Sequence, residues 1–76
     1  MHLAIVAGNY HQAVNYARKH GYQPREWFYV DDPYMLKGLS NVAVRFEGTW
    51  RSHPRIAQIQ KEVTLLRSMD RATVVE

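Results

Sequence analysis

At 76 residues the chain can bury only about 60% of its unfolded surface, which predicts a single domain over residues 1–76 with a thin core. Its composition, 46% hydrophobic and 22% charged, excludes a disordered chain, and the absence of cysteine excludes disulfides and thiolate metal sites. The net charge of +3 is spread over ten basic residues mixed with seven acidic ones, which argues against a nucleic-acid-binding tail.

The apolar stretch near the N-terminus, Leu3 to Ala7, is too short for a signal-peptide core or a membrane span. We therefore expect a cytoplasmic protein without a membrane partner. A small domain that lacks disulfides and metals often gains stability by self-association. This predicts a homodimer.

Residues 3–7 have the length of a strand, and the segment that follows has helical spacing of its apolar residues, among them Ala13 and Ala17. Asn9 is a good residue to cap the start of that helix. The run from Arg18 to Gly21 places cations in the last turn and then a glycine, which predicts the end of the helix.

A second strand is predicted over Trp27 to Val30, which is rich in aromatic and β-branched residues. The segment "PYMLKGLSN", residues 33–41, favours a single helical turn or a loop, because Pro33 opens it and Gly38 lies within it. We expect its apolar side chains to pack against the sheet: Tyr34, Met35, Leu36 and Leu39.

The third strand, "NVAVRFE", alternates between an apolar face with Val42, Val44 and Phe46 and a second face with Ala43, Arg45 and Glu47. From Pro54 onward, apolar residues recur at three-four-three spacing and predict an amphipathic helix that runs to about Met69. The apolar stripe is Ile56, Ile59, Val63 and Leu66. We place His53 at its N-cap, and residues 72–75, "ATVV", predict a short fourth strand.

The order strand, helix, strand, turn, strand, helix is typical of an α/β domain with right-handed crossovers. We predict a small Rossmann-like fold with a mostly parallel sheet of three to four strands and two main helices. Two helices cannot fully cover both faces of such a sheet, and Arg45 and Glu47 indicate that one face is at least partly wet or used by a partner. This is a second argument for a dimer.

Ligands of open α/β sheets bind beyond the carboxyl ends of the strands, where three loops of this chain converge. They are residues 8–11, 31–34 and 48–53. Two of these loops open helices that lack acidic residues near their starts, which favours an anion there. Alternatively, Asp31 and Asp32 supply the counter-charge from within the chain.

Neither the three-glycine dinucleotide motif nor a Walker A motif is present. Asp31 lies 23 positions after Gly8, close to the spacing of a ribose-binding acid, but an Asp that caps the turn before Pro33 is the alternative. His53 is the one histidine in the candidate cleft, and we expect it to cap the following helix instead of acting as a general acid or base. The four histidines form no zinc site. We expect no metal, no cofactor and no catalytic residue.

Trp50 and Arg51 form an aromatic and basic pair of the kind that anchors protein interfaces or stacks on a nucleotide base. A structural role, in which Trp50 covers the small core, is the alternative. Thr49 is suited to bind loop backbone or an anion. The candidate residues for ligand or partner binding are Gly8, Asn9, Tyr10, Asp31, Asp32, Thr49, Trp50, Arg51 and His53.

The segments "IVAGNY" and "FEGTWRSHP", with the Ala13 and Ala17 pattern between them, resemble a family of small, uncharacterised α/β proteins from phages of actinobacteria. The resemblance spans about residues 3–66 and implies the fold and a viral origin, with the host cytoplasm as location. From the small size, the aromatic and basic loop and the lack of a catalytic constellation, we expect a non-catalytic interaction protein that binds a host protein through these loops. A binder of nucleotides or phosphorylated metabolites, with or without enzymatic activity, is the alternative, and weak nucleic-acid binding comes third.

Overall fold

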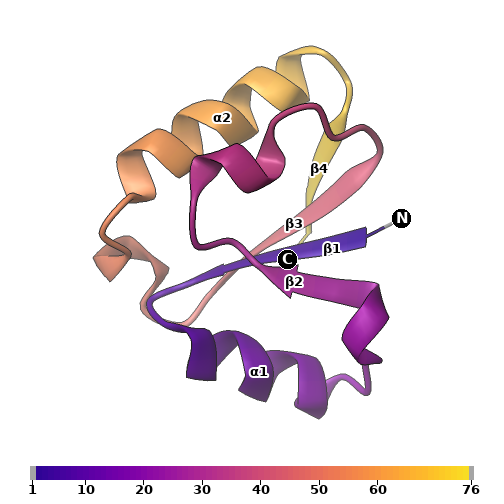
Figure 1. Cartoon of the computed structure of the whole chain (residues 1–76), viewed down its shortest axis with the longest axis vertical. Coiled ribbons are helices and arrows are strands. Elements are labelled where there is room, and N and C mark those ends of the chain that lie inside the picture. The colour runs from indigo at the N-terminus through magenta and orange to yellow at the C-terminus, as the bar shows by residue number, and fades with distance from the viewer. Residues whose placement is uncertain (1, 76) are drawn as a thin grey trace.

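A four-stranded sheet forms the middle layer of the protein (Figure 1). A computed structural model describes residues 2–75, in which all neighbouring strands are parallel and their order is β2-β1-β3-β4. The Rossmann-like α/β fold is thus confirmed, with a sheet that is parallel throughout. The strands are β1 (His2–Ala7), β2 (Trp27–Tyr29), β3 (Val42–Glu47) and β4 (Ala72–Val75).

The two α-helices of the described chain cover opposite faces of the sheet, α2 (Ile56–Ser68) above and α1 (Tyr10–Lys19) below in Figure 1. Every residue of β1 from Leu3 to Ala7 is buried, because this central strand is covered on both faces. The cluster on the α1 face is rich in alanine and therefore thin: Leu3, Ile5, Ala7, Ala13, Ala17 and Ala43.

Helix α1 begins and ends where the sequence predicts. The side chain of Asn9 accepts a hydrogen bond from the backbone N–H of Gln12 at 3.0 Å, which is an N-cap contact. Arg18 and Lys19 occupy the last turn, and Gly21 follows with a φ of 72°. These local signals hold because each depends only on neighbours in the chain.

Strand β3 alternates as its sequence predicts. Val42 and Val44 are buried on the α2 face, while Arg45 and Glu47 lie on the α1 face and form an ion pair with 2.8 Å between Arg45 Nη2 and Glu47 Oε1. The guanidinium of Arg45 also lies over the ring of Tyr16. The two charged side chains remain 25% and 31% exposed, so this face is partly open to solvent.

The predicted start of the second helix is wrong by two residues. Helix α2 begins at Ile56 with Arg55 as its N-cap, whereas Pro54 was expected to open it after His53. The reason is that His53 turns its ring inward and accepts the backbone N–H of Arg55 at 3.0 Å. Residues 53–55 therefore form a turn, which follows a 3₁₀ turn, η3 (Trp50–Ser52).

The segment after β2 also packs less tightly than expected. It forms a 3₁₀ turn, η2 (Pro33–Leu36), that buries Leu36, and Leu39 packs beside it. Tyr34 and Met35 are 74% and 41% exposed, so they do not cover the sheet. A turn of four residues has only one inward face, and consecutive side chains cannot share it.

Within residues 2–75, no helix combines the length and the apolar character that crossing a membrane requires.

Candidate functional site

The candidate site lies at the carboxyl edge of the sheet, on the left in Figure 1. Because the strands are parallel, β1, β2 and β3 all end there, and they lead into α1, η2 and η3 respectively. The order of strands reverses between β1 and β3, which is the position where open α/β sheets bind ligands. The three predicted loops therefore do meet at one edge.

The crevice between β1 and β3 is filled by the side chain of Gln12. Its Oε1 accepts the backbone N–H of Gly8 at 2.9 Å and that of Thr49 at 3.0 Å. Its Nε2 donates to the hydroxyl of Thr49 at 2.9 Å. The structure thus brings Gly8 and Thr49 together, but the two N–H groups that would hold an anion are already bonded within the chain.

Two glycines make room for Gln12. A Cβ on Gly8 would collide with the hydroxyl of Thr49 and lie 2.7 Å from its carbonyl oxygen, and a Cβ on Gly48 would lie 2.6 Å from Gln12 Oε1. Gly48 also has a φ of 58°, a conformation that favours glycine. The role of Gln12 is not predictable from the sequence, since a glutamine in the first turn of a helix carries no recognisable signal.

Asp31 and Asp32 act differently from each other. A side-chain oxygen of Asp32 accepts the N–H of Tyr34 at 2.8 Å and so caps η2, a role that the turn-capping alternative gave to Asp31. The side chain of Asp31 is exposed, and its backbone oxygen accepts a hydrogen bond from the guanidinium of Arg55 at 3.4 Å.

His53 is 2% exposed and lies beneath the site. Its Nε2 is 3.0 Å from the carbonyl oxygen of Val30, and its Nδ1 accepts the N–H of Arg55. A carbonyl only accepts, so the hydrogen is on Nε2 and the ring is the neutral tautomer. Both nitrogens are used to tie the end of β2 to the start of α2, which leaves neither for a ligand.

Trp50 and Arg51 lie on η3, near the carboxyl end of β3. The ring of Trp50 packs against Phe46 with 4.9 Å between ring centroids, and Trp50 is only partly exposed. Arg51 is exposed and stacks on Trp50, with its guanidinium carbon 4.7 Å from the centroid. Trp50 therefore covers one end of the α2-side core, in line with the structural alternative.

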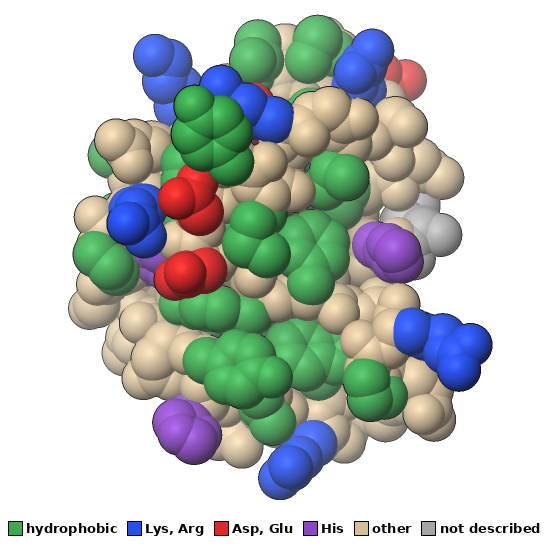
Figure 2. Space-filling view, viewed as in Figure 1, with side chains coloured by type: hydrophobic (Ala, Val, Ile, Leu, Met, Phe, Trp, Pro, Cys, Tyr) green, Lys and Arg blue, Asp and Glu red, His purple; other side chains and the backbone are tan. Residues whose placement is uncertain are grey.

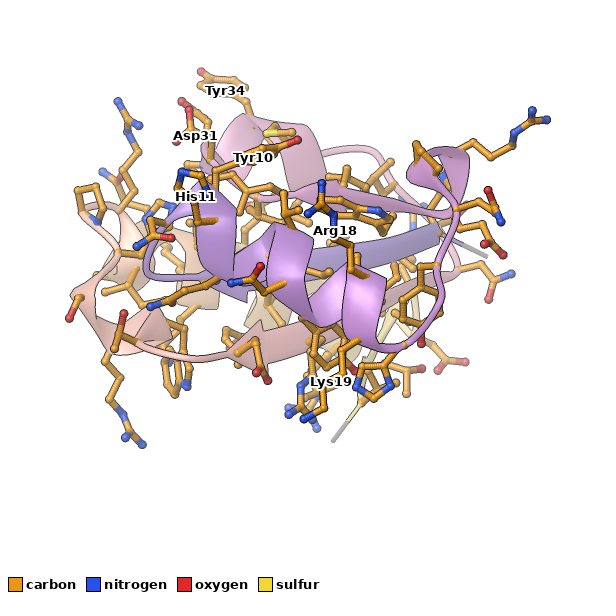
Figure 3. The ribbon with its side chains drawn as sticks, turned by 90° about the horizontal axis from the view of Figure 1, so that it is seen from below. Tyr10, His11, Arg18, Lys19, Asp31 and Tyr34 are labelled. Atoms are coloured by element: carbon orange, nitrogen blue, oxygen red, sulfur yellow. The ribbon has the colours of Figure 1, made fainter. Side chains whose placement is uncertain are left out.

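The most exposed aromatic residues of the edge are Tyr10 and Tyr34, at 58% and 74%. Figure 3 shows both near Asp31 at one end of the molecule, whereas Arg18 and Lys19 lie at the other end of α1. The ring of Tyr10 stacks on Trp27, centroid to centroid 6.3 Å, and meets Tyr29 edge-on at 5.8 Å.

The acidity of Tyr29 is clearly shifted. Burial, and to a lesser extent the negative charge of Asp31, raise the pKa of its hydroxyl above the ordinary value of 10.0. The hydroxyl therefore keeps its proton at neutral pH.

A shallow groove of about 430 Å³ lies beside Tyr34, between η2 and the first turns of α2. Three cations line it, Lys37, Arg55 and Lys61, together with Asp32 and Glu62. The ammonium of Lys37 lies over the ring of Tyr34. No group of three or more histidine, aspartate or glutamate side chains among residues 2–75 is arranged to hold a metal ion.

Comparison with protein-family models, curated proteins and solved structures finds no match for this chain. The chemistry of the carboxyl edge is therefore the basis for assigning a function.

Proposed function

We propose that the protein is a non-catalytic interaction module that binds a protein partner through the loops at the carboxyl edge of its sheet. The observation that carries the proposal is the exposure of Tyr34, 74%, on a turn that Asp32 holds in place. Tyr10 and Met35 add exposed apolar area nearby. Tyrosine on a firmly held turn is typical of binding hot spots, because it offers a large surface and loses little entropy.

The filled crevice supports the same proposal. A Rossmann-like domain that binds a nucleotide presents backbone N–H groups to phosphate at the strand-order reversal. Here the N–H groups of Gly8 and Thr49 are bonded to Gln12 instead, and His53 is enclosed by Val30 and Arg55. What this edge offers to the outside is a set of side chains on loops, which suits a protein surface.

The chemistry of the edge also describes the partner. Tyr34 needs an apolar pocket, and the carboxylates of Asp31 and Asp32 favour a basic side chain beside that pocket. We propose that the partner is a host protein and that the two meet in the host cytoplasm, as the resemblance to phage proteins implies.

Replacing Tyr34 with alanine is expected to weaken partner binding by about 2 kcal/mol, roughly 30-fold in Kd, because it removes the most exposed aromatic ring of the edge. The measurement is isothermal titration calorimetry with the purified partner. That partner is first captured from a bacterial lysate on the wild-type protein.

Tyr22→Ala is the matched control, since Tyr22 is also exposed, at 38%. It follows α1 and lies at the end of the sheet where the strands begin, opposite the carboxyl edge. It should bind like the wild type. Equal losses in both variants, or no loss in either, would show that the carboxyl edge is not the binding surface.

A small phosphorylated ligand is the second candidate function, and the groove between η2 and α2 is the observation that favours it. Lys37, Arg55 and Lys61 line this groove beside an aromatic ring, an arrangement that suits a phosphate and a planar base. The ligand would thus lie beside α2 and not in the crevice that Gln12 fills.

A thermal-shift series with nucleotides and sugar phosphates tests this candidate. A ligand at one hundred times its Kd should add about 2.7 kcal/mol to the free energy of unfolding. Lys61→Ala should reduce the shift, whereas Lys19→Ala, on the far end of α1, should preserve it. A flat series, or a shift that both variants retain, rules the groove out.

A further inference from the structure

The outer edge of β2 is an open strand edge. β2 is the first strand in the sheet order, so it has a neighbour on one side only, and all three of its residues are partly exposed. They are Trp27, Phe28 and Tyr29, so none of the three is a lysine or a proline, two residues that often protect such an edge. Figure 2 views this edge directly, and hydrophobic side chains gather over its centre.

The backbone direction of β2 follows from its pairing with β1. The N–H of Val30 donates to the carbonyl oxygen of Ile5 at 2.9 Å, so Val30 presents its backbone groups to β1. Successive residues of a strand present these groups to opposite sides, so Phe28 also faces β1. The N–H and C=O groups of Trp27 and Tyr29 consequently point away from the sheet.

We propose that β2 pairs with β2 of a second copy of this chain, antiparallel and centred on Phe28. In this register Trp27 lies opposite Tyr29 of the second copy, and each such pair exchanges both backbone hydrogen bonds. This register places the outward-pointing N–H and C=O groups of Trp27 opposite those of Tyr29 in the second copy, so that both residues can form hydrogen bonds. The two sheets then form one continuous sheet across a two-fold axis.

The side chains fit the same register. On the α1 face, Trp27 and Tyr29 would form aromatic cross-strand pairs, and Tyr10, already stacked on Trp27, would extend them. On the α2 face, Phe28 would meet Phe28 of the second copy. These rings are partly exposed in the single chain, and pairing removes them from water.

The charged residues at the two ends of β2 favour a second copy of this chain as the partner that pairs with the strand. Arg25 lies just before the strand and Asp31 just after it, and both side chains are exposed. The remaining charge at the start, Glu26, accepts the backbone N–H of Gln23 at 2.6 Å. Antiparallel pairing places Arg25 of each copy beside Asp31 of the other, so the edge is complementary to itself.

Sedimentation velocity of the purified chain and of two charge-reversal variants tests this dimer. The wild type should sediment at a mass close to twice 8.9 kDa when its concentration reaches roughly 100 μM. Arg25→Glu and Asp31→Arg should each be monomeric, with a dimer Kd weakened at least tenfold, because each places like charges side by side twice. An equimolar mixture of the two variants should dimerise, since both contacts then join opposite charges.

Arg71→Glu is the control at the other sheet edge, since Arg71 is exposed and precedes β4. Arg71→Glu should dimerise like the wild type. Tyr34→Ala, which is expected to weaken binding of the protein partner, should dimerise as well, so loss of partner binding and loss of dimerisation are separate results. Circular dichroism checks that the variants fold. A monomeric wild type, a mixture that stays monomeric, or loss of the dimer in Arg71→Glu would overturn the pairing through β2.

Discussion

Replacing Gly8 with alanine is expected to lower the free energy of unfolding by about 3 kcal/mol, because the new Cβ has no space. It would collide with the hydroxyl of Thr49 and lie 2.7 Å from the carbonyl oxygen of Thr49, which is backbone and cannot rotate away. Gly8 is not among the glycines with positive φ, so the loss would come from the collision alone. Urea unfolding measures it.

Two comparisons identify the cause. Gly38→Ala introduces strain at a φ of 77° in open space, and it should cost only about 1 kcal/mol. Thr49→Ala removes the hydroxyl but keeps the carbonyl of residue 49. In this variant, Gly8→Ala should lower the free energy of unfolding by less than it does in the wild type. The loss should still exceed that of Gly38→Ala. If Gly8→Ala unfolds at the wild-type urea concentration, β1 and η3 do not approach each other as closely as described.

Replacing His53 with alanine is expected to cost about 3 kcal/mol and to lower the Tm by roughly 10–20 °C. The ring is 2% exposed and makes two hydrogen bonds, to the carbonyl of Val30 and from the N–H of Arg55. Its loss leaves both backbone groups without their partner and opens a cavity where β2 ends and α2 begins. Differential scanning calorimetry gives the size of the effect.

His53→Asn separates the two contacts. The shorter side chain keeps an oxygen that can accept from Arg55 but does not reach Val30, so its cost should fall between the wild type and His53→Ala. His11→Ala is the matched control, because His11 lies exposed on α1, and its Tm should stay within a few degrees of the wild type. A ligand-binding histidine would give the opposite result, a loss of binding with little loss of stability.

Taken together, the two residues explain why the crevice between β1 and β3 resembles a nucleotide site although its polar groups are bonded within the chain. Gly8 follows the first strand, as in Rossmann-like proteins, but it serves the close approach of Thr49 and Gln12. His53 occupies a loop at the edge, but it ties together the ends of β2 and α2. Exposed side chains on the surrounding turns, above all Tyr34, are what remain for contact with another molecule.

The site was partly predictable. Parallel strands must end at one edge, so the order of elements predicts that the loops of Gly8, Asp31 and Thr49 lie together. Gln12 was not predictable, because its role depends on Thr49, which lies 37 positions further along the chain. The inward turn of His53 was missed for the same reason, since its partner Val30 lies 23 positions away.

Local patterns in the sequence predict most of the secondary structure of this protein. Strand β1, the caps of α1, the alternation of β3 and the apolar stripe of α2 depend on residues within a few positions of each other, where hydrophobic period and capping act. Which polar groups face solvent, and which form hydrogen bonds inside the protein, depends on the tertiary structure. The internal hydrogen bonds join segments that are far apart in the chain, as Gln12 bonds to Thr49 and His53 to Val30. They form because a buried polar group that lacks a hydrogen-bond partner is costly.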